Sequence, residues 1–120
     1  MIYLDNAATT RVAPEVFEAM TPFLQEEYGN PSSVYALAGR AAAALQQARQ
    51  SIADFIGARP EEIVFTGGGS EADNLAIKGT MRKFGDGHMI TSAIEHHAVL
   101  HTCQALQDEG FELTILPVDQ

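Results

Sequence analysis

The sequence predicts an α/β fold with a mostly parallel sheet. In the second half of the chain, short β-branched and aromatic runs alternate with stretches of helical periodicity. Glycines and short turns separate these runs from one another. Strands and helices of these lengths are typical of right-handed β-α-β crossovers, which make neighbouring strands parallel. We therefore expect functional residues at the carboxyl ends of the strands, where open parallel sheets bind ligands.

Residues 1–60 are predicted to form an amino-terminal segment with helices. Ile2 to Leu4 is predicted to be a short strand. Pro14 lies where the first residue of a helix would be, and apolar residues follow it at helical spacing. Pro22 predicts a kink or a brief break in that helix. A long helix is then expected from Val34 to Gly57, where the glycine ends it.

Residues 61–120 are predicted to repeat a pattern of strand, turn and helix. The expected strands are Ile63 to Phe65, His88 to Ser92 and Glu112 to Leu116, and the expected helices are Ser70 to Phe84 and His97 to Asp108. Three strands are few for a parallel sheet, which is normally covered on both faces. The unit therefore looks unfinished.

Composition and charge exclude several classes of function. The 120 residues are 46% hydrophobic and 19% charged, which is typical of a globular domain. Sixteen acidic against seven basic residues give a net charge of −9, which repels nucleic-acid phosphates and anionic lipids. The sequence has neither a basic leader with an apolar core nor a run long enough to cross a membrane. We expect a cytoplasmic protein that binds neither nucleic acid nor membranes.

The turn at residues 67–69 allows two interpretations. Its glycines would let a ligand approach the backbone, and the helix amides with the Ser70 hydroxyl could donate to a phosphate. The spacing matches neither the dinucleotide fingerprint nor the Walker loop. Alternatively, Ser70 caps its helix with Asp73 as its partner, and the Glu71 and Asp73 carboxylates satisfy the helix dipole. The turn alone slightly favours capping.

Other candidate residues lie on or next to the last helix. His96 follows a strand end, where it could stack on a planar cofactor, act as an acid or base, or be a surface histidine. His97 and His101 share a helical face, but the sequence offers no third zinc ligand, so we expect no metal site. Cys103 lies on the apolar face of the helix and is expected to be an inert core thiol.

Four motifs occur in order along the chain: Tyr3 to Thr10 (YLDNAATT), Gly29 to Ser33 (GNPSS), Ile63 to Gly79 (IVFTGGGSEADNLAIKG) and Ile90 to Cys103 (ITSAIEHHAVLHTC). Together they resemble the amino-terminal part of the cysteine desulfurases of the NifS/IscS type, which are class V, fold type I pyridoxal-phosphate enzymes. The resemblance implies a partial fold type I transferase with the first three strands of its sheet. Residues 1–60 would be the amino-terminal segment, and 61–120 would begin the cofactor-binding large domain of a chain several times longer.

The resemblance implies pyridoxal 5′-phosphate as cofactor and three residues that bind it. Gly69 and Ser70 match positions that anchor the phosphate, and His96 matches the histidine that stacks on the pyridine ring. The family usually has Thr where Ser70 stands, and often Ala at Gly69. The family's Schiff-base lysine and sulfur-accepting cysteine would lie beyond this sequence, so we expect no catalytic residue here. Lys78 and Lys83 are expected to be solvated.

The resemblance also implies a reaction and partners. The family converts L-cysteine to alanine and transfers the sulfur to an enzyme persulfide, for iron–sulfur clusters or other sulfur delivery. It implies a homodimer and a sulfur-acceptor protein such as an iron–sulfur scaffold. The implied fold would leave residues 1–120 with open sheet edges and exposed apolar faces. Alone, they are therefore expected to fold poorly and to be inactive. Alternatives are another class V enzyme, such as a selenocysteine lyase or an aminotransferase, and a small phosphate-binding module without catalysis.

Overall fold

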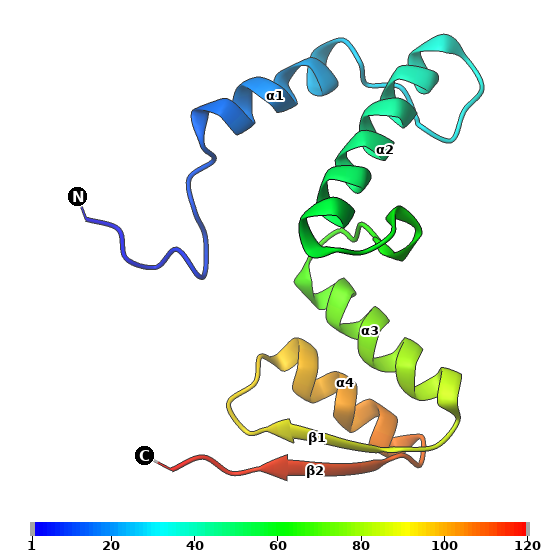
Figure 1. Ribbon diagram of the computed structural model, residues 1–120. Coiled ribbons are helices and arrows are strands. Elements are labelled where there is room, and N and C mark those ends of the chain that lie inside the picture. The colour runs from blue at the N-terminus through cyan, green and yellow to red at the C-terminus, as the bar shows by residue number, and fades with distance from the viewer. Residues whose placement is uncertain (1, 120) are drawn as a thin grey trace. The chain divides into compact units, whose positions relative to one another are not determined.

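The computed structural model describes residues 2–119 and has the α/β organisation that the sequence predicts. Its backbone divides into two compact units, which meet in the sequence between Val64 and Phe65. The elements are α1 (Pro14–Gln25), α2 (Ala36–Ile56), the short 3-10 helix η1 (Pro60–Glu62), α3 (Gly69–Phe84), β1 (His88–Ser92), α4 (His97–Asp108) and β2 (Glu112–Leu116) (Figure 1).

The helices of the first unit begin and end close to their predicted positions. α1 begins at Pro14, as expected, because a proline fits a first helical position. The predicted break at Pro22 is wrong: the helix continues to Gln25, and the amides of the next turn bond to the Pro22 carbonyl. α2 ends at Gly57, whose φ of 70° is the left-handed conformation that glycine adopts readily.

The predicted strand at Ile2 to Leu4 is wrong. This segment pairs with no strand in the described part of the chain. Side chains hold the residues around it instead: the Tyr3 hydroxyl donates to the Asp5 carbonyl at 2.9 Å and lies 2.6 Å from the Thr9 hydroxyl. A strand needs a hydrogen-bonded neighbour, so the residue pattern of this segment is not enough to make it a strand.

The predicted strand at Ile63 to Phe65 is also wrong. The described residues contain one sheet, and β1 and β2 are its two strands. η1 precedes this segment, and the Arg49 guanidinium donates a hydrogen bond to the Ile63 carbonyl. The carbonyl is therefore satisfied by a side chain, in place of a bond from a neighbouring strand.

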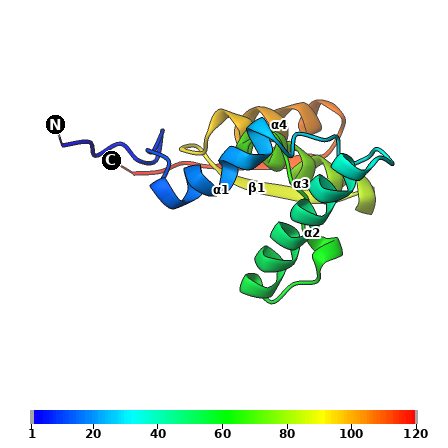
Figure 2. The same ribbon diagram turned by 90° about the horizontal axis from the view of Figure 1, so that it is seen from above.

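The second unit has two helices on one face of a two-stranded parallel sheet. β1, α4 and β2 have the predicted bounds, and α3 begins one residue earlier than expected. β1 and β2 are parallel, with Met89 opposite Leu113. Met89, Cys103 and Leu106 form the buried core, and Ile77, Met81, Val99, Phe111 and Leu113 pack around it. This core fixes α3 and α4 side by side over the strands (Figure 2).

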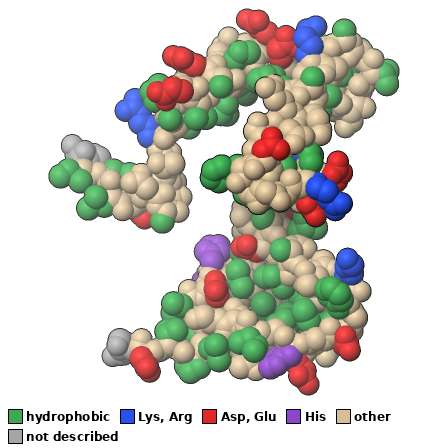
Figure 3. Space-filling view, viewed as in Figure 1, with side chains coloured by type: hydrophobic (Ala, Val, Ile, Leu, Met, Phe, Trp, Pro, Cys, Tyr) green, Lys and Arg blue, Asp and Glu red, His purple; other side chains and the backbone are tan. Residues whose placement is uncertain are grey.

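Apolar side chains remain exposed, as the sequence led us to expect. On the face of the sheet away from the core, Ile90 is 63% exposed and Leu116 is 49% exposed. Figure 3 shows hydrophobic side chains gathered over the part of the surface formed by this unit. No helix in residues 2–119 is long and apolar enough to cross a membrane.

Candidate functional site

A pocket of about 360 Å³ lies between α3 and the amino-terminal half of α4, in the second unit. We call it the α3–α4 pocket. It is lined by Ser70, Asn74 and Lys78 of α3 and by His96, His97, Ala98, His101 and Thr102 at the start of α4. The two helices run side by side, with their amino ends at the same end of the unit (Figure 1). Ser70 and His96 therefore line one pocket, and Gly69 immediately precedes Ser70 in α3.

Ser70 does not cap α3, so that part of the capping interpretation is wrong, whereas Glu71 lies in the first turn of the helix, as the interpretation expects. The N-cap is Gly68, and no side chain makes the capping bond there. The Glu71 carboxylate accepts the Gly67 N–H at 2.6 Å, and the Thr66 hydroxyl donates to the Gly68 carbonyl at 3.2 Å. The Ser70 hydroxyl makes no hydrogen bond to any residue that the structure describes. It can therefore donate into the pocket.

The charges around the pocket favour an anion. Among the described residues, no carboxylate lines it, so neither Glu71 nor Asp73 faces the space. Lys78 does line it and is half-buried, so it is less exposed than the sequence led us to expect. Lys83 is exposed as expected, and its ammonium lies 5.8 Å from the centre of the Phe84 ring. The two lysines of α3 thus have different surroundings.

His96 caps α4, a role that the sequence analysis did not identify. It is the N-cap residue, and its Nδ1 accepts the Ala98 N–H at 3.1 Å. A nitrogen that accepts carries no proton, so in the neutral ring the proton is on Nε2. This bond fixes the orientation of an exposed imidazole at the edge of the pocket. The ring is therefore held in place for contact with a planar group.

The rings of His97 and His101 stack on each other, with centroids 4.9 Å apart and planes inclined by 22°. The described residues contain no cluster of three or more His, Cys, Asp or Glu side chains that could hold a metal ion.

Cys103 lies in the core at 4% exposure, as the sequence predicts. Burial, followed by the nearby Glu95 charge, raises the pKa of its thiol. These features favour a structural role for the cysteine.

Two possible phosphate donors in the pocket, Lys78 and Thr102, could not be recognised as site residues from the sequence. Thr102 is 3% exposed, lines the pocket and has no hydrogen-bond partner among the described residues. Nothing in the local sequence distinguishes it from a helix-face threonine. Its role depends on the packing of α4 against α3, because only that packing places it beside Lys78.

The residues of the α3–α4 pocket fit a phosphorylated planar cofactor. The Ser70 and Thr102 hydroxyls and the Lys78 ammonium are donors for a phosphate. The amides of the first turn of α3 add donors and the positive end of its helix dipole, whereas the Ala98 amide of α4 already bonds to His96. His96 offers a flat ring of fixed orientation in the same pocket.

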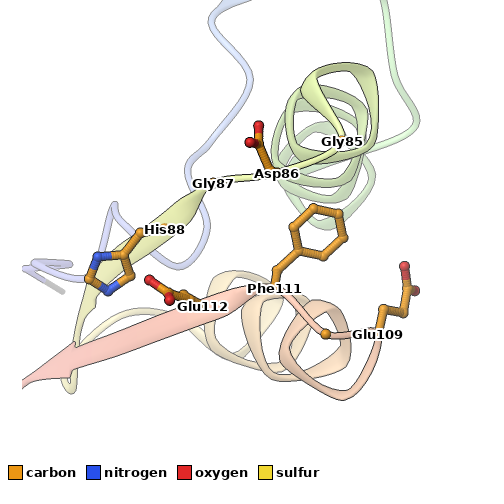
Figure 4. Close-up of a pocket in the computed structure, with 8 residues that line it drawn as sticks. Gly85, Asp86, Gly87, His88, Glu109, Phe111 and Glu112 are labelled. Carbon is orange, nitrogen blue, oxygen red and sulfur yellow. The ribbon is translucent and has the colours of Figure 1, made fainter.

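A second cavity, of about 460 Å³, lies at the opposite ends of β1 and β2. Its lining includes Asp86, His88, Glu109 and Glu112, and the carboxylates diverge from one another (Figure 4). Glu109 is bound by Arg82 at 2.6 Å, and His88 shares a 2.7 Å hydrogen bond with Thr114. This acidic lining disfavours a phosphate and leaves the α3–α4 pocket as the candidate site.

Comparison with known proteins agrees with the resemblance. The family model for aminotransferase class-V matches residues 2–120. The chain is 53% identical to cysteine desulfurase IscS of Methanosarcina thermophila over 99% of its own length and 30% of that protein. A solved NifS-like protein superposes with a TM-score of 0.86 and 39% identity, covering 95% of this chain and 32% of that one. SspA, solved in complex with cysteine, superposes with a TM-score of 0.83 and 50% identity, covering 92% and 32%. The chain thus spans about a third of the length of the relatives it matches.

Proposed function

The chain belongs to the aminotransferase class-V family, and from that premise we propose that it provides the phosphate-binding side of a pyridoxal-phosphate-dependent cysteine desulfurase. The observation that carries this proposal is the α3–α4 pocket, which Ser70 and His96 line together. Relatives named cysteine desulfurase, about 50% identical over almost the whole chain, support the assignment within the family.

Three residues would hold the cofactor. Gly69 lets its backbone come close to the phosphate, and the Ser70 hydroxyl and the helix amides donate to the phosphate oxygens. The His96 imidazole is oriented by its bond to the Ala98 amide and would stack on the cofactor ring. Bound pyridoxal phosphate supplies an electron sink for bonds at the α-carbon of an amino acid. In this proposal, residues 1–120 contribute cofactor binding and no catalytic residue, so alone they are inactive.

We propose L-cysteine as the substrate of the complete protein. Its C–S bond breaks, and the sulfur forms an S–S bond with a cysteine thiol of the enzyme, which leaves alanine and a persulfide. The neighbour solved with cysteine supports this substrate class. We further propose a cytoplasmic homodimer that passes sulfur to an acceptor protein, such as an iron–sulfur scaffold.

A pair of serine variants of the complete protein tests the proposal. Ser70→Ala removes a hydroxyl from the pocket, whereas Ser51→Ala removes one that bonds to the Gln47 carbonyl within α2. We expect the dissociation constant for pyridoxal phosphate, measured from cofactor absorbance, to rise about tenfold in Ser70→Ala, since a hydrogen bond to a charged group contributes about 1.5–3 kcal/mol. It should not change in Ser51→Ala. Unchanged affinity in both variants would contradict the proposal.

The products distinguish the substrate assignment from its alternatives. With L-cysteine and a thiol reductant, the complete protein should form alanine and sulfide in equal amounts. Turnover of L-selenocysteine but not of L-cysteine would indicate a selenocysteine lyase. Amino transfer to a keto acid would indicate an aminotransferase. Phosphate binding without turnover of any amino acid would leave a phosphate-binding module.

A further inference from the structure

We propose that Lys78 and Thr102 are additional ligands of the cofactor phosphate and act together with Ser70. This inference rests on the proposed function, because it concerns the same pocket and the same phosphorylated ligand. The three side chains come from two helices and line one space of about 360 Å³. A phosphate dianion presents three terminal oxygens, so it can accept from all three donors at once.

The hydroxyl of Thr102 makes no hydrogen bond within its helix. Helical threonine and serine side chains often bond back to the carbonyl four residues earlier. Thr21 does so to Phe17 at 2.8 Å, and Ser51 does so to Gln47 at 3.0 Å. Thr102 makes no such bond, although it is only 3% exposed. Among residues 2–119 no fully buried side-chain oxygen or nitrogen lacks a partner, so the unbonded Thr102 oxygen is accessible, and it is accessible from the pocket that Thr102 lines. A ligand in the pocket could accept a hydrogen bond from it.

The position of Lys78 supports the proposal as well. Ser70, Asn74 and Lys78 are four residues apart in turn, so they share one face of α3. Lys78 lines the same pocket as Ser70, and helical side chains tend to lean toward the amino end of their helix, which is the Ser70 side. Asn74 lies between them and uses its side-chain amide to bind the Ser70 carbonyl at 2.9 Å. Lys78 is therefore the cation of this face.

The charge of Lys78 is not neutralised by an ion pair among residues 2–119. Its positive charge contributes to lowering the pKa of Glu109, but the carboxylate of Glu109 is bound by Arg82. A half-buried, unpaired cation in a chain of net charge −9 favours an anion nearby. Because no described carboxylate lines the pocket, that anion would come from a ligand.

Matched variants of the complete protein test the inference. Lys78→Gln removes the charge, and Thr102→Val removes the hydroxyl while it keeps the shape of the side chain. Lys83→Gln and Thr80→Val are the controls, since both residues lie on α3 and are exposed. Each variant is titrated with pyridoxal phosphate, with pyridoxal, which lacks the phosphate, and with inorganic phosphate as a competitor.

We expect the dissociation constant for pyridoxal phosphate to rise about tenfold in Lys78→Gln and about fivefold in Thr102→Val, as for other charge-assisted hydrogen bonds. Affinity for pyridoxal should not change, and inorganic phosphate should compete less well. Thr102→Ser should restore phosphate affinity, because it restores the hydroxyl. The two controls should bind like the unmodified protein.

Four outcomes would overturn the inference. Equal losses for pyridoxal phosphate and pyridoxal would indicate a structural role for the two residues. Weaker binding of inorganic phosphate with unchanged affinity for pyridoxal phosphate would assign them to a different oxyanion. If Ser70→Ala weakens cofactor binding and the Lys78 and Thr102 variants do not, the inference fails and the proposed function stands. If none of the three weakens it, both fail.

Discussion

Gly29 lies directly against the backbone of Leu37, so closely that no side chain fits between them. A Cβ atom on Gly29 would lie 2.6 Å from the carbonyl carbon of Leu37 and 2.8 Å from the Ala38 nitrogen. Both neighbours belong to the first turn of α2, and Ala38 is fully buried. The contact therefore determines how the chain enters this helix.

Gly29→Ala should destabilise the protein by about 1–3 kcal/mol, because backbone atoms cannot move aside as easily as a flexible side chain. Gly39→Ala is the control: its new methyl group would meet nothing within 4 Å and would lie inside α2. It should stabilise the protein by about 0.5–1 kcal/mol. Urea denaturation of both variants measures the difference. Equal stability of the two would show that the contact is unimportant.

Leu106→Ala should cost about 2–5 kcal/mol of unfolding free energy. Leu106 is fully buried and packs with Met89 and Cys103, so truncation leaves a cavity at the centre of the second unit. Leu75→Ala, at a residue that is 52% exposed, should change stability by less than about 0.5 kcal/mol. Chemical denaturation of each variant provides the measurement. A smaller loss for Leu106 than for Leu75 would contradict this core.

Cys103 should react slowly with iodoacetamide in the native protein. Its raised pKa reduces the thiolate fraction at a given pH, and its burial blocks the reagent. At about pH 8 we expect alkylation at least ~10-fold slower than for free cysteine. The rate should reach that of free cysteine when urea unfolds the chain. Fast alkylation without denaturant would contradict the structural role.

The Arg82–Glu109 ion pair should make stability depend on acidic pH. Arg82 binds both carboxylate oxygens of Glu109, at 2.6 and 3.2 Å, and this contact lowers the pKa of Glu109 from its ordinary value of 4.5. A lowered folded-state pKa means that the stabilisation is complete above pH 4.5 and is lost as the pH falls through the folded-state value.

Glu109→Gln should therefore be less stable than the unmodified protein at about pH 6. The difference in unfolding free energy between the two proteins should become smaller toward about pH 3. Urea midpoints at the two pH values measure it. Glu112→Gln is the control, because Glu112 forms no ion pair within residues 2–119. A stability difference that becomes larger as the pH falls would contradict this prediction.

Local sequence predicted the helices well and the strands only where they have a partner. β1 and β2 have their predicted bounds, and they pair with each other. Ile2 to Leu4 and Ile63 to Phe65 have similar residue patterns, but no described strand lies beside them. A helix satisfies its own backbone, whereas a strand depends on residues distant in sequence.

The candidate site was predictable in the same limited way. Ser70 and His96 belong to motifs at two predicted strand-to-helix turns. The sequence therefore placed both residues at the carboxyl edge of the predicted sheet, and both line the pocket. Lys78 and Thr102 lie inside helices, where spacing predicts only the face of each residue. They line the same pocket because α3 packs against α4, and this packing cannot be predicted from the local sequence.

The bond between Glu71 and the Gly67 amide affects the entropy of ligand binding. With the Thr66 hydroxyl bound to the Gly68 carbonyl, it ties both sides of a turn that three consecutive glycines would otherwise leave loose. Ordering one residue costs about 1–2 kcal/mol. Because these bonds order the turn during folding, a phosphate bound there, as proposed, would meet a preorganised backbone and would lose less affinity to that ordering.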